Sequence, residues 1–143
     1  MNQLLRTVDA KPLEDEHVLV QKSLRRILSQ DIASHLNIPA YDRSWLDGYA
    51  VKSGDTKEAS KDKPVMLKVV GKVFPEDYPV ATQVTEGQAV SLSCGGPIPK
   101  GADAVIKVES TELWKEKIKV THPVERGNGV IKPGEDIKKG VFI

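Results

Sequence analysis

The organisation of this chain turns on the stretch Tyr41-Asp42-Arg43-Ser44-Trp45-Leu46-Asp47-Gly48-Tyr49-Ala50-Val51. It carries two carboxylates, an arginine, a serine and three aromatic side chains, and it shows neither a helical nor a strand period. The pattern before it is helical, whereas the pattern after it is one of short strands. Polar and aromatic side chains gathered in a connection between regular elements indicate a binding surface.

The segment before this stretch predicts a helix. Ser23 is a suitable N-cap, and the apolar residues that follow it have the spacing of one helix face: Leu24, Ile27, Leu28 and Ile32. Residues 17–20 predict a short strand, and residues 2–9 predict one or two further helical turns. We therefore expect a helical element at the N-terminal end of the fold.

The segment after the stretch predicts a β-rich lobe. Apolar runs predict strands at residues 65–74, 89–93, 104–108, 117–121 and 141–143. Glycine, proline and polar residues predict turns at residues 85–88, 95–101, 127–129 and 133–136, and the charged run 55–63 predicts a solvated loop. The expected fold class is α+β, mostly β, in which an N-terminal helix precedes a small antiparallel barrel or sandwich. Because the chain ends on three apolar residues in an apparent strand, we expect it to belong to a longer protein.

Composition narrows the class of protein. A length of 143 residues suits one domain or two small lobes with a shared core. Basic and acidic residues number 21 and 20, and this balance argues against a nucleic-acid or anionic-membrane partner. No apolar run approaches the length of a transmembrane helix. The single cysteine, Cys94, cannot form an internal disulfide, so we expect a cytoplasmic protein.

Each candidate site feature, taken singly, is compatible with either a functional or a purely structural role. Asp42 and Asp47 could hold a hydrated Mg²⁺ ion together with phosphate oxygens, but Asp47-Gly48 is equally a common turn pair. The loop at residues 95–101 could present backbone N–H groups to an anion, although most such loops are only turns. Composition favours a buried Cys94, with contact to a ligand as the alternative. The histidines His17, His35 and His122 show no metal-site spacing.

Three segments together resemble one family. Residues 42–50 resemble the signature D-x-S-x-M-D-G-Y-A, and residues 93–105 look like T-G-A-P-x-P-x-G-A-D-A-V, followed by a matching Glu109. Gly134-Glu135-Asp136 matches a G-E-D motif, and Arg26-Ile27-Leu28 and Ile38-Pro39 match upstream positions. In this order, from about residue 11 to residue 143, the chain resembles the N-terminal region, domains I and II, of the molybdopterin molybdenumtransferases, the MoeA/gephyrin E-domain family.

The resemblance implies a role in molybdenum cofactor synthesis. Members of that family insert molybdate into molybdopterin-adenylate with the help of Mg²⁺, and they are homodimers. Their site lies between the β-rich domain II of one subunit and a molybdopterin-binding domain of the other. By this resemblance, residues 1–40 and 137–143 correspond to a partial linking domain I of a helix and edge strands, and residues 41–136 to domain II.

The resemblance also implies site residues. Asp47 and Asp136 correspond to catalytic carboxylates, with Asp47 also a metal ligand. The implied substrate-binding residues are Ser44, Cys94, Gly95 and Gly96. Cys94 stands where the family has threonine, and Ile131 stands where it usually has arginine or serine.

We expect the pterin-binding domain to lie in the parent protein or in a separate chain, and this fragment to be inactive alone. The alternative is a stand-alone, non-catalytic dimerisation or interaction module with the same fold.

Overall fold

The computed structural model describes residues 13–143, and the chain falls into two compact units. The first unit combines the segment up to Ile32 with the two last residues of the chain, Phe142–Ile143. The second unit is Ala33–Val141. The signature stretch, the cysteine segment and the G-E-D motif all lie in the second unit. The domain boundaries expected from the sequence, after residues 40 and 136, stay a prediction.

The predicted N-terminal helix is wrong. The helical elements of the described residues are short 3-10 turns: η2 (Val20–Lys22), η3 (Ser53–Thr56) and η4 (Val108–Ser110). Arg25 has a φ of +66°, in the left-handed region that interrupts an α-helix, and Ile27 is 96% exposed. A ten-residue amphipathic helix depends on packing of its apolar face, and that packing is missing here.

Other expectations for the ends of the chain also fail. Residues 17–20 do not form the predicted strand, because η2 begins at Val20. No strand covers residues 141–143. The helical turns expected at residues 2–9 lie outside the described residues. Nor does the described part of the chain contain a helix long and apolar enough to cross a membrane.

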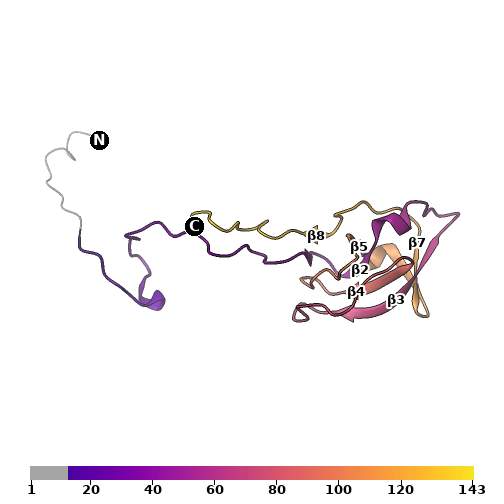
Figure 1. The fold of residues 1–143 in the computed structure, drawn as a ribbon, viewed down its shortest axis with the longest axis horizontal. Coiled ribbons are helices and arrows are strands. Elements are labelled where there is room, and N and C mark those ends of the chain that lie inside the picture. Colours follow the sequence, from indigo (N-terminus) through magenta and orange to yellow (C-terminus); the bar gives the residue numbers. More distant parts are fainter. Residues whose placement is uncertain (1–12) are drawn as a thin grey trace, which may run out of the picture. The chain divides into compact units, whose positions relative to one another are not determined.

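The second unit is built on a curled, six-stranded sheet (Figure 1). Its order is β5-β2-β4-β3-β7-β6. The strands are β2 (Gly48–Val51), β3 (Val65–Val73), β4 (Gln88–Leu92), β5 (Ala104–Lys107), β6 (Thr111–Trp114) and β7 (Lys117–Val120). This confirms the mostly-β prediction and, to within one residue at each end, four of the predicted strands. The expected antiparallel pairing holds except between β3 and β4, which are parallel.

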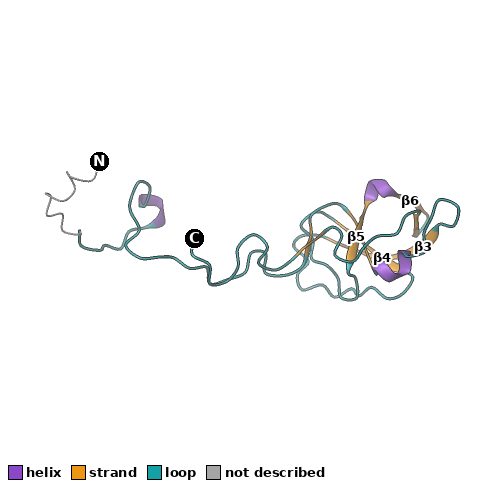
Figure 2. Cartoon of the chain, turned by 90° about the horizontal axis from the view of Figure 1, so that it is seen from above, coloured by secondary structure: helices purple, strands orange, loops and turns teal. Residues whose placement is uncertain are grey.

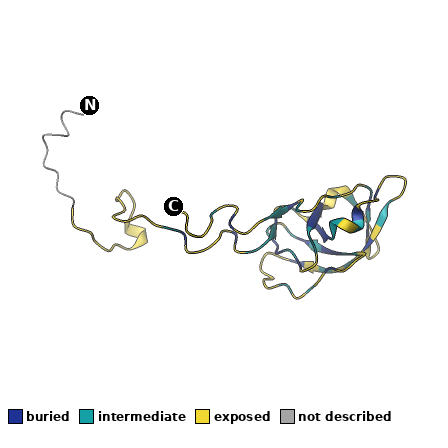
Figure 3. Ribbon diagram, turned by 45° about the horizontal axis from the view of Figure 1, so that its top comes forward, coloured by how far each residue is buried: buried dark blue, intermediate teal, exposed yellow. Residues whose placement is uncertain are grey.

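The core lies on both faces of this sheet. One apolar cluster includes Tyr49, Val51 and Leu67, and the other includes Ala50 and Val90. Because all four residues of β2 are buried, this strand contributes side chains to both clusters in alternation. The buried residues concentrate in the sheet region of Figure 3.

Two extended segments, residues 33–44 and 130–141, run side by side (Figures 1 and 2). The strand β1 (Arg43–Ser44) pairs with β8 (Val130–Ile131) in antiparallel register. Farther along, the N–H of Ile38 donates to the carbonyl of Ile137 at 2.8 Å, and the N–H of Ile137 donates back at 3.0 Å. This ladder brings the G-E-D motif to the signature stretch.

Candidate functional site

The candidate site consists of three segments of the second unit. They are the signature loop (residues 41–51), the cysteine loop (residues 93–101) and the acidic turn (residues 132–136). Each carries one of the motifs recognised in the sequence. The backbone places the signature loop between the other two, because Arg43 pairs with Pro97 on one side and with Ile131 on the other.

Main-chain hydrogen bonds join the signature loop to the cysteine loop. The N–H of Ser44 donates to the carbonyl of Gly96 at 2.8 Å, and the N–H of Gly95 donates to the carbonyl of Ser44 at 2.7 Å. The N–H of Ile98 donates to the carbonyl of Asp42 at 2.9 Å. The cysteine loop thereby lies along β1, where Arg43 and Pro97 form an isolated antiparallel bridge.

The Asp47 side chain adds a further link between these loops. Its Oδ1 accepts the backbone N–H of Cys94 at 2.9 Å, and its main-chain carbonyl accepts the N–H of Val108 at 3.2 Å. Asp47 is exposed, and among the described contacts no partner is found for its Oδ2. The protein therefore orients an exposed carboxylate through one of its two oxygens.

Cys94 is exposed, so the expectation of a buried thiol is wrong. The reason is the turn in which it lies. The N–H of Gly96 donates to the carbonyl of Ser93 at 2.8 Å, which closes a four-residue turn with Cys94 in its second position. A turn tip of this kind directs its side chain away from the sheet.

Glycine is required in the cysteine loop for the turn itself. Gly95 has a φ of +82° in the third position, the conformation for which type II turns need glycine. A Cβ on Gly96 would lie 2.8 Å from the carbonyl oxygen of Ser93. The N–H groups of Cys94, Gly95 and Gly96 all donate within the protein, so they do not form an open anion-binding nest. The turn interpretation of this loop is favoured.

Ser44 has a structural environment. It is completely buried, its Oγ donates to the carbonyl of Leu46 at 2.6 Å, and the N–H of Leu46 lies 3.3 Å from the same Oγ. Such side-chain bonds to a neighbouring backbone stabilise tight turns. The geometry favours a role in shaping the signature loop over the substrate contact expected from the sequence.

The acidic turn is held by ion pairs. Arg43 Nη2 lies 3.1 Å from Asp136 Oδ2, and Lys132 Nζ lies 2.8 Å from Asp42 Oδ2. The N–H of Lys132 also donates to Glu135 Oε2 at 2.8 Å. These charges are partly exposed, so each pair contributes orientation more than stability.

The two predicted catalytic carboxylates are not in contact. Asp47 bonds to the cysteine loop, whereas Asp136 bonds to Arg43 from the side of β8. Among the described contacts none joins the two. Any joint action on a substrate therefore requires a molecule that extends along the signature loop.

Sequence reasoning missed several participants. Arg43 occupies a variable position of the signature motif, so only its charge hinted at a role. Lys132 gave no signal, because its partner Asp42 lies 90 positions away. Trp45 is 54% exposed, and Lys107 Nζ lies 5.7 Å from its ring centroid, a cation–π contact beside the motif.

The metal-ligating side chains of this chain suit only a metal site that is completed by other ligands. Within residues 13–143, no three His, Cys, Asp or Glu side chains gather closely enough to hold a metal ion. Mg²⁺ commonly takes one or two carboxylates together with water and phosphate oxygens. The exposed Asp47 fits one such ligand position, and the remaining ligands would come from substrate, water or another chain segment.

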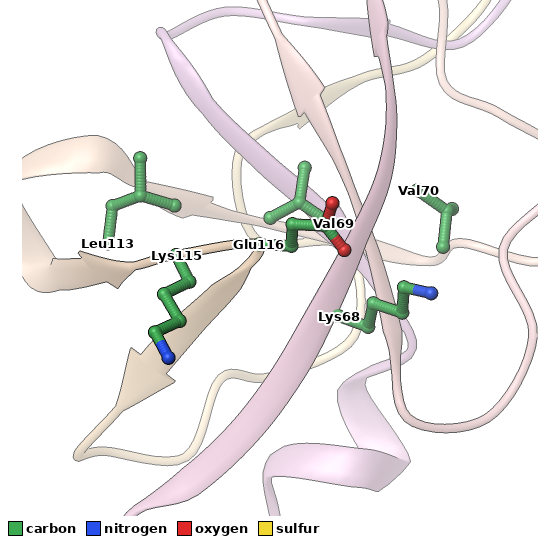
Figure 4. A pocket seen from close by; sticks show the side chains of 6 residues that line it. All are labelled: Lys68, Val69, Val70, Leu113, Lys115 and Glu116. Atoms are coloured by element: carbon green, nitrogen blue, oxygen red, sulfur yellow. The ribbon is translucent and has the colours of Figure 1, made fainter.

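A hollow of about 500 Å³ lies apart from the motif residues (Figure 4). Its side chains come from β3 and from the β6–β7 hairpin: Lys68, Val69, Val70, Leu113, Lys115 and Glu116. It is wide open to solvent and contains no residue of the three motif segments. We do not include it in the candidate site.

Comparison with known proteins agrees with the family resemblance seen in the sequence. Residues 1–143 match the family described as MoeA N-terminal region (domain I and II). The chain belongs to this family.

Among curated relatives, the chain is 36% identical over 137 residues to the molybdopterin molybdenumtransferase of Synechococcus elongatus, covering 96% of this chain and 34% of that protein. It is 39% identical over 136 residues to the Bacillus subtilis protein of the same name, covering 89% of this chain and 30% of that protein.

A crystal structure of a molybdopterin biosynthesis MoeA protein from Pyrococcus horikoshii OT3 has the same fold. The TM-score is 0.85 at 38% sequence identity, and the match covers 90% of this chain and 34% of that chain. The chain thus spans about a third of the length of the relatives that it matches.

Proposed function

We propose that this chain is the N-terminal part of a molybdopterin molybdenumtransferase, which inserts molybdate into molybdopterin-adenylate during molybdenum cofactor biosynthesis. The observation that carries the proposal is the Asp47 carboxylate, which is exposed and is oriented by the Cys94 N–H between the signature loop and the cysteine loop. The names of the curated relatives support the reaction class.

In this proposal Asp47 supplies negative charge at the reacting side of the substrate. It would provide one ligand to Mg²⁺, which when bound would offset charge on the phosphate oxygens of the adenylate. Asp136 is a supporting carboxylate that acts by holding Arg43. Gly95 and Gly96 allow the turn that presents Cys94.

The Cys94 side chain is proposed as a substrate contact at the exposed tip of the cysteine loop. A thiol is a weaker hydrogen-bond partner than the threonine hydroxyl of the family motif. We therefore expect Cys94→Thr to preserve or improve function, whereas a bulky residue at this position would obstruct the site.

One wall of a site does not catalyse a two-substrate reaction, because positioning needs both faces. We therefore propose that a molybdopterin-binding domain of the longer protein or of a separate chain completes the site. We propose further that the parent is a cytoplasmic homodimer, in which residues 1–40 and 137–143 form part of domain I and residues 41–136 form domain II. Calorimetry should detect negligible binding of molybdopterin-adenylate by the isolated chain, and tight binding would contradict this proposal.

The reaction can be tested in a chimera. The N-terminal region of the Bacillus subtilis relative is replaced by this chain, and the chimera is expressed in a strain that lacks its molybdenumtransferase. The measured quantity is the activity of a molybdenum-dependent nitrate reductase. We expect rescue, loss of rescue by Asp47→Ala, and full rescue by the matched control Asp62→Ala, an exposed carboxylate in the connection between η3 and β3.

A further variant separates charge from geometry. Asp47→Asn keeps an oxygen that can accept the Cys94 N–H but removes the negative charge. Loss of rescue by Asp47→Asn, with its fold intact by circular dichroism, supports the catalytic role. Rescue by every Asp47 variant would favour the second candidate function, a non-catalytic dimerisation or interaction module, which the substitutions at Cys94 and Ile131 motivate.

A further inference from the structure

A loop that carries none of the family motifs lies against the candidate site. This tyrosine loop, residues 74–79, follows β3 directly. It is closed by its own hydrogen bonds: the N–H of Phe74 donates to Asp77 Oδ2 at 2.8 Å, and the N–H of Asp77 donates to the carbonyl of Phe74 at 3.1 Å. The loop therefore has a defined shape that can support its neighbours.

The tyrosine loop contacts the signature loop through two stacked rings. The ring centroids of Tyr41 and Tyr78 are 3.9 Å apart, and the ring planes differ by 7°. Tyr78 is 57% exposed, and neither ring belongs to an apolar core cluster. The stack is thus a surface contact between two loops and not part of the core.

The same loop also reaches the cysteine loop. Pro75 lies beside Gly95, where an added Cβ would be 3.7 Å from the Pro75 ring carbon Cγ. Just before the loop, the carbonyl of Val73 accepts the N–H of Ser93 at 3.1 Å. The tyrosine loop is consequently anchored to both loops that carry the exposed groups of the site.

Tyr41 connects the ring stack to the rest of the signature loop. It immediately precedes Asp42, whose carbonyl accepts the N–H of Ile98 and whose carboxylate pairs with Lys132. Fixing the Tyr41 ring restricts the first residue of the signature loop. That restriction favours the register in which the signature loop pairs with the cysteine loop.

We propose that Tyr78 is a positioning residue of the candidate site, which holds the signature and cysteine loops together through its stack on Tyr41. The stack needs a ring at position 78 and not its hydroxyl group. The inference concerns how the loops are held, so it stands apart from the transferase activity proposed above.

Amide hydrogen exchange in this chain, followed by NMR, tests the proposal. The reporter amides are those of Gly95 and Ile98, which donate across the two loops, and the reference amides are those of β4. The variants are Tyr78→Ala and Tyr78→Phe. The matched control is Trp114→Ala, which removes another exposed aromatic ring, on β6.

We expect Tyr78→Ala to raise exchange at the reporter amides roughly 2- to 10-fold, as loss of an aromatic stack implies, with β4 unchanged. Tyr78→Phe should stay within about 2-fold of the wild type, because the ring is retained. Unchanged reporter exchange in Tyr78→Ala would overturn the proposal. So would an equal rise in the reporters and in β4, which would indicate general destabilisation, or an equal rise in Trp114→Ala.

Discussion

Replacement of Gly48 by alanine should unfold a large part of the protein population under mild denaturing conditions. Gly48 begins β2, an interior strand of the sheet, opposite Leu92 of β4 and Lys107 of β5. A Cβ at this position would overlap the carbonyl oxygen of Ile106, lie 2.9 Å from its carbonyl carbon, and touch Leu46 Cδ1 at 3.0 Å. The obstacle is backbone, which cannot move aside by a change of rotamer.

The expected cost follows from this geometry. Overpacking of a filled core typically destabilises by about 1–3 kcal/mol, and the upper end applies where a strand must shift. We therefore expect Gly48→Ala to lower the free energy of unfolding by about 3 kcal/mol or more, out of a total of about 5–15 kcal/mol for a domain. With a urea dependence of about 2 kcal/mol per molar, the midpoint falls by about 1.5 M.

The measurement is urea unfolding followed by circular dichroism. Gly54→Ala is the matched control, because an added Cβ there has no neighbour within 4 Å and Gly54 has no positive φ. The control should stay within about 0.5 kcal/mol of the wild type. If Gly48→Ala and Gly54→Ala unfold at the same urea concentration, the packing argument for the glycine of the D-G-Y-A motif is refuted.

Three further predictions concern the core, the surface and the thiol. Leu67→Ala, at a side chain with 1% exposure, should lower the free energy of unfolding by about 2–5 kcal/mol in the same assay, and a smaller loss would mean that the site collapses. The hydrogen bond from Lys63, together with the positive charge of Lys63, lowers the pKa of Glu58. The stabilisation by this pair is therefore present above the ordinary carboxyl pKa, and it is lost as the pH falls through the lowered pKa of Glu58. Titration by NMR should show the pKa of Glu58 rising in Lys63→Met, and an unchanged value would contradict this. The exposed Cys94 should react with a thiol reagent under native conditions to one equivalent, whereas reaction only after unfolding would contradict its exposure.

The sequence motifs identified most residues of the candidate site, but they did not predict the contacts that these residues make. Asp47, Cys94 and Asp136 stood out by pattern, and the fold brings their segments together. The partners that orient them did not stand out, because Lys132 and Arg43 are ordinary charged residues until pairing brings them to carboxylates 90 and 93 positions away. The burial of Ser44 was equally hidden, since a serine in a polar loop is usually exposed.

The sequence by itself determined those strands and turns that have a clear local pattern of residue types. The strands β3, β4, β5 and β7 have apolar runs bounded by turn residues, and β-branched residues favour strands wherever they pack. Glycine and proline at residues 127–129 and 133–136 determined the turns, because few other residues adopt such backbone conformations.

Tertiary structure decided the rest. The strand β2 has no visible period because it is buried on both faces, and burial on both faces depends on neighbours far along the chain. The segment from Leu24 to Ile32 has a helical period but no packed face among the described residues, so the pattern alone did not make a helix. The same physical reason covers both cases: a short element takes its conformation from the surface that it packs against, and that surface is assembled only when the chain folds.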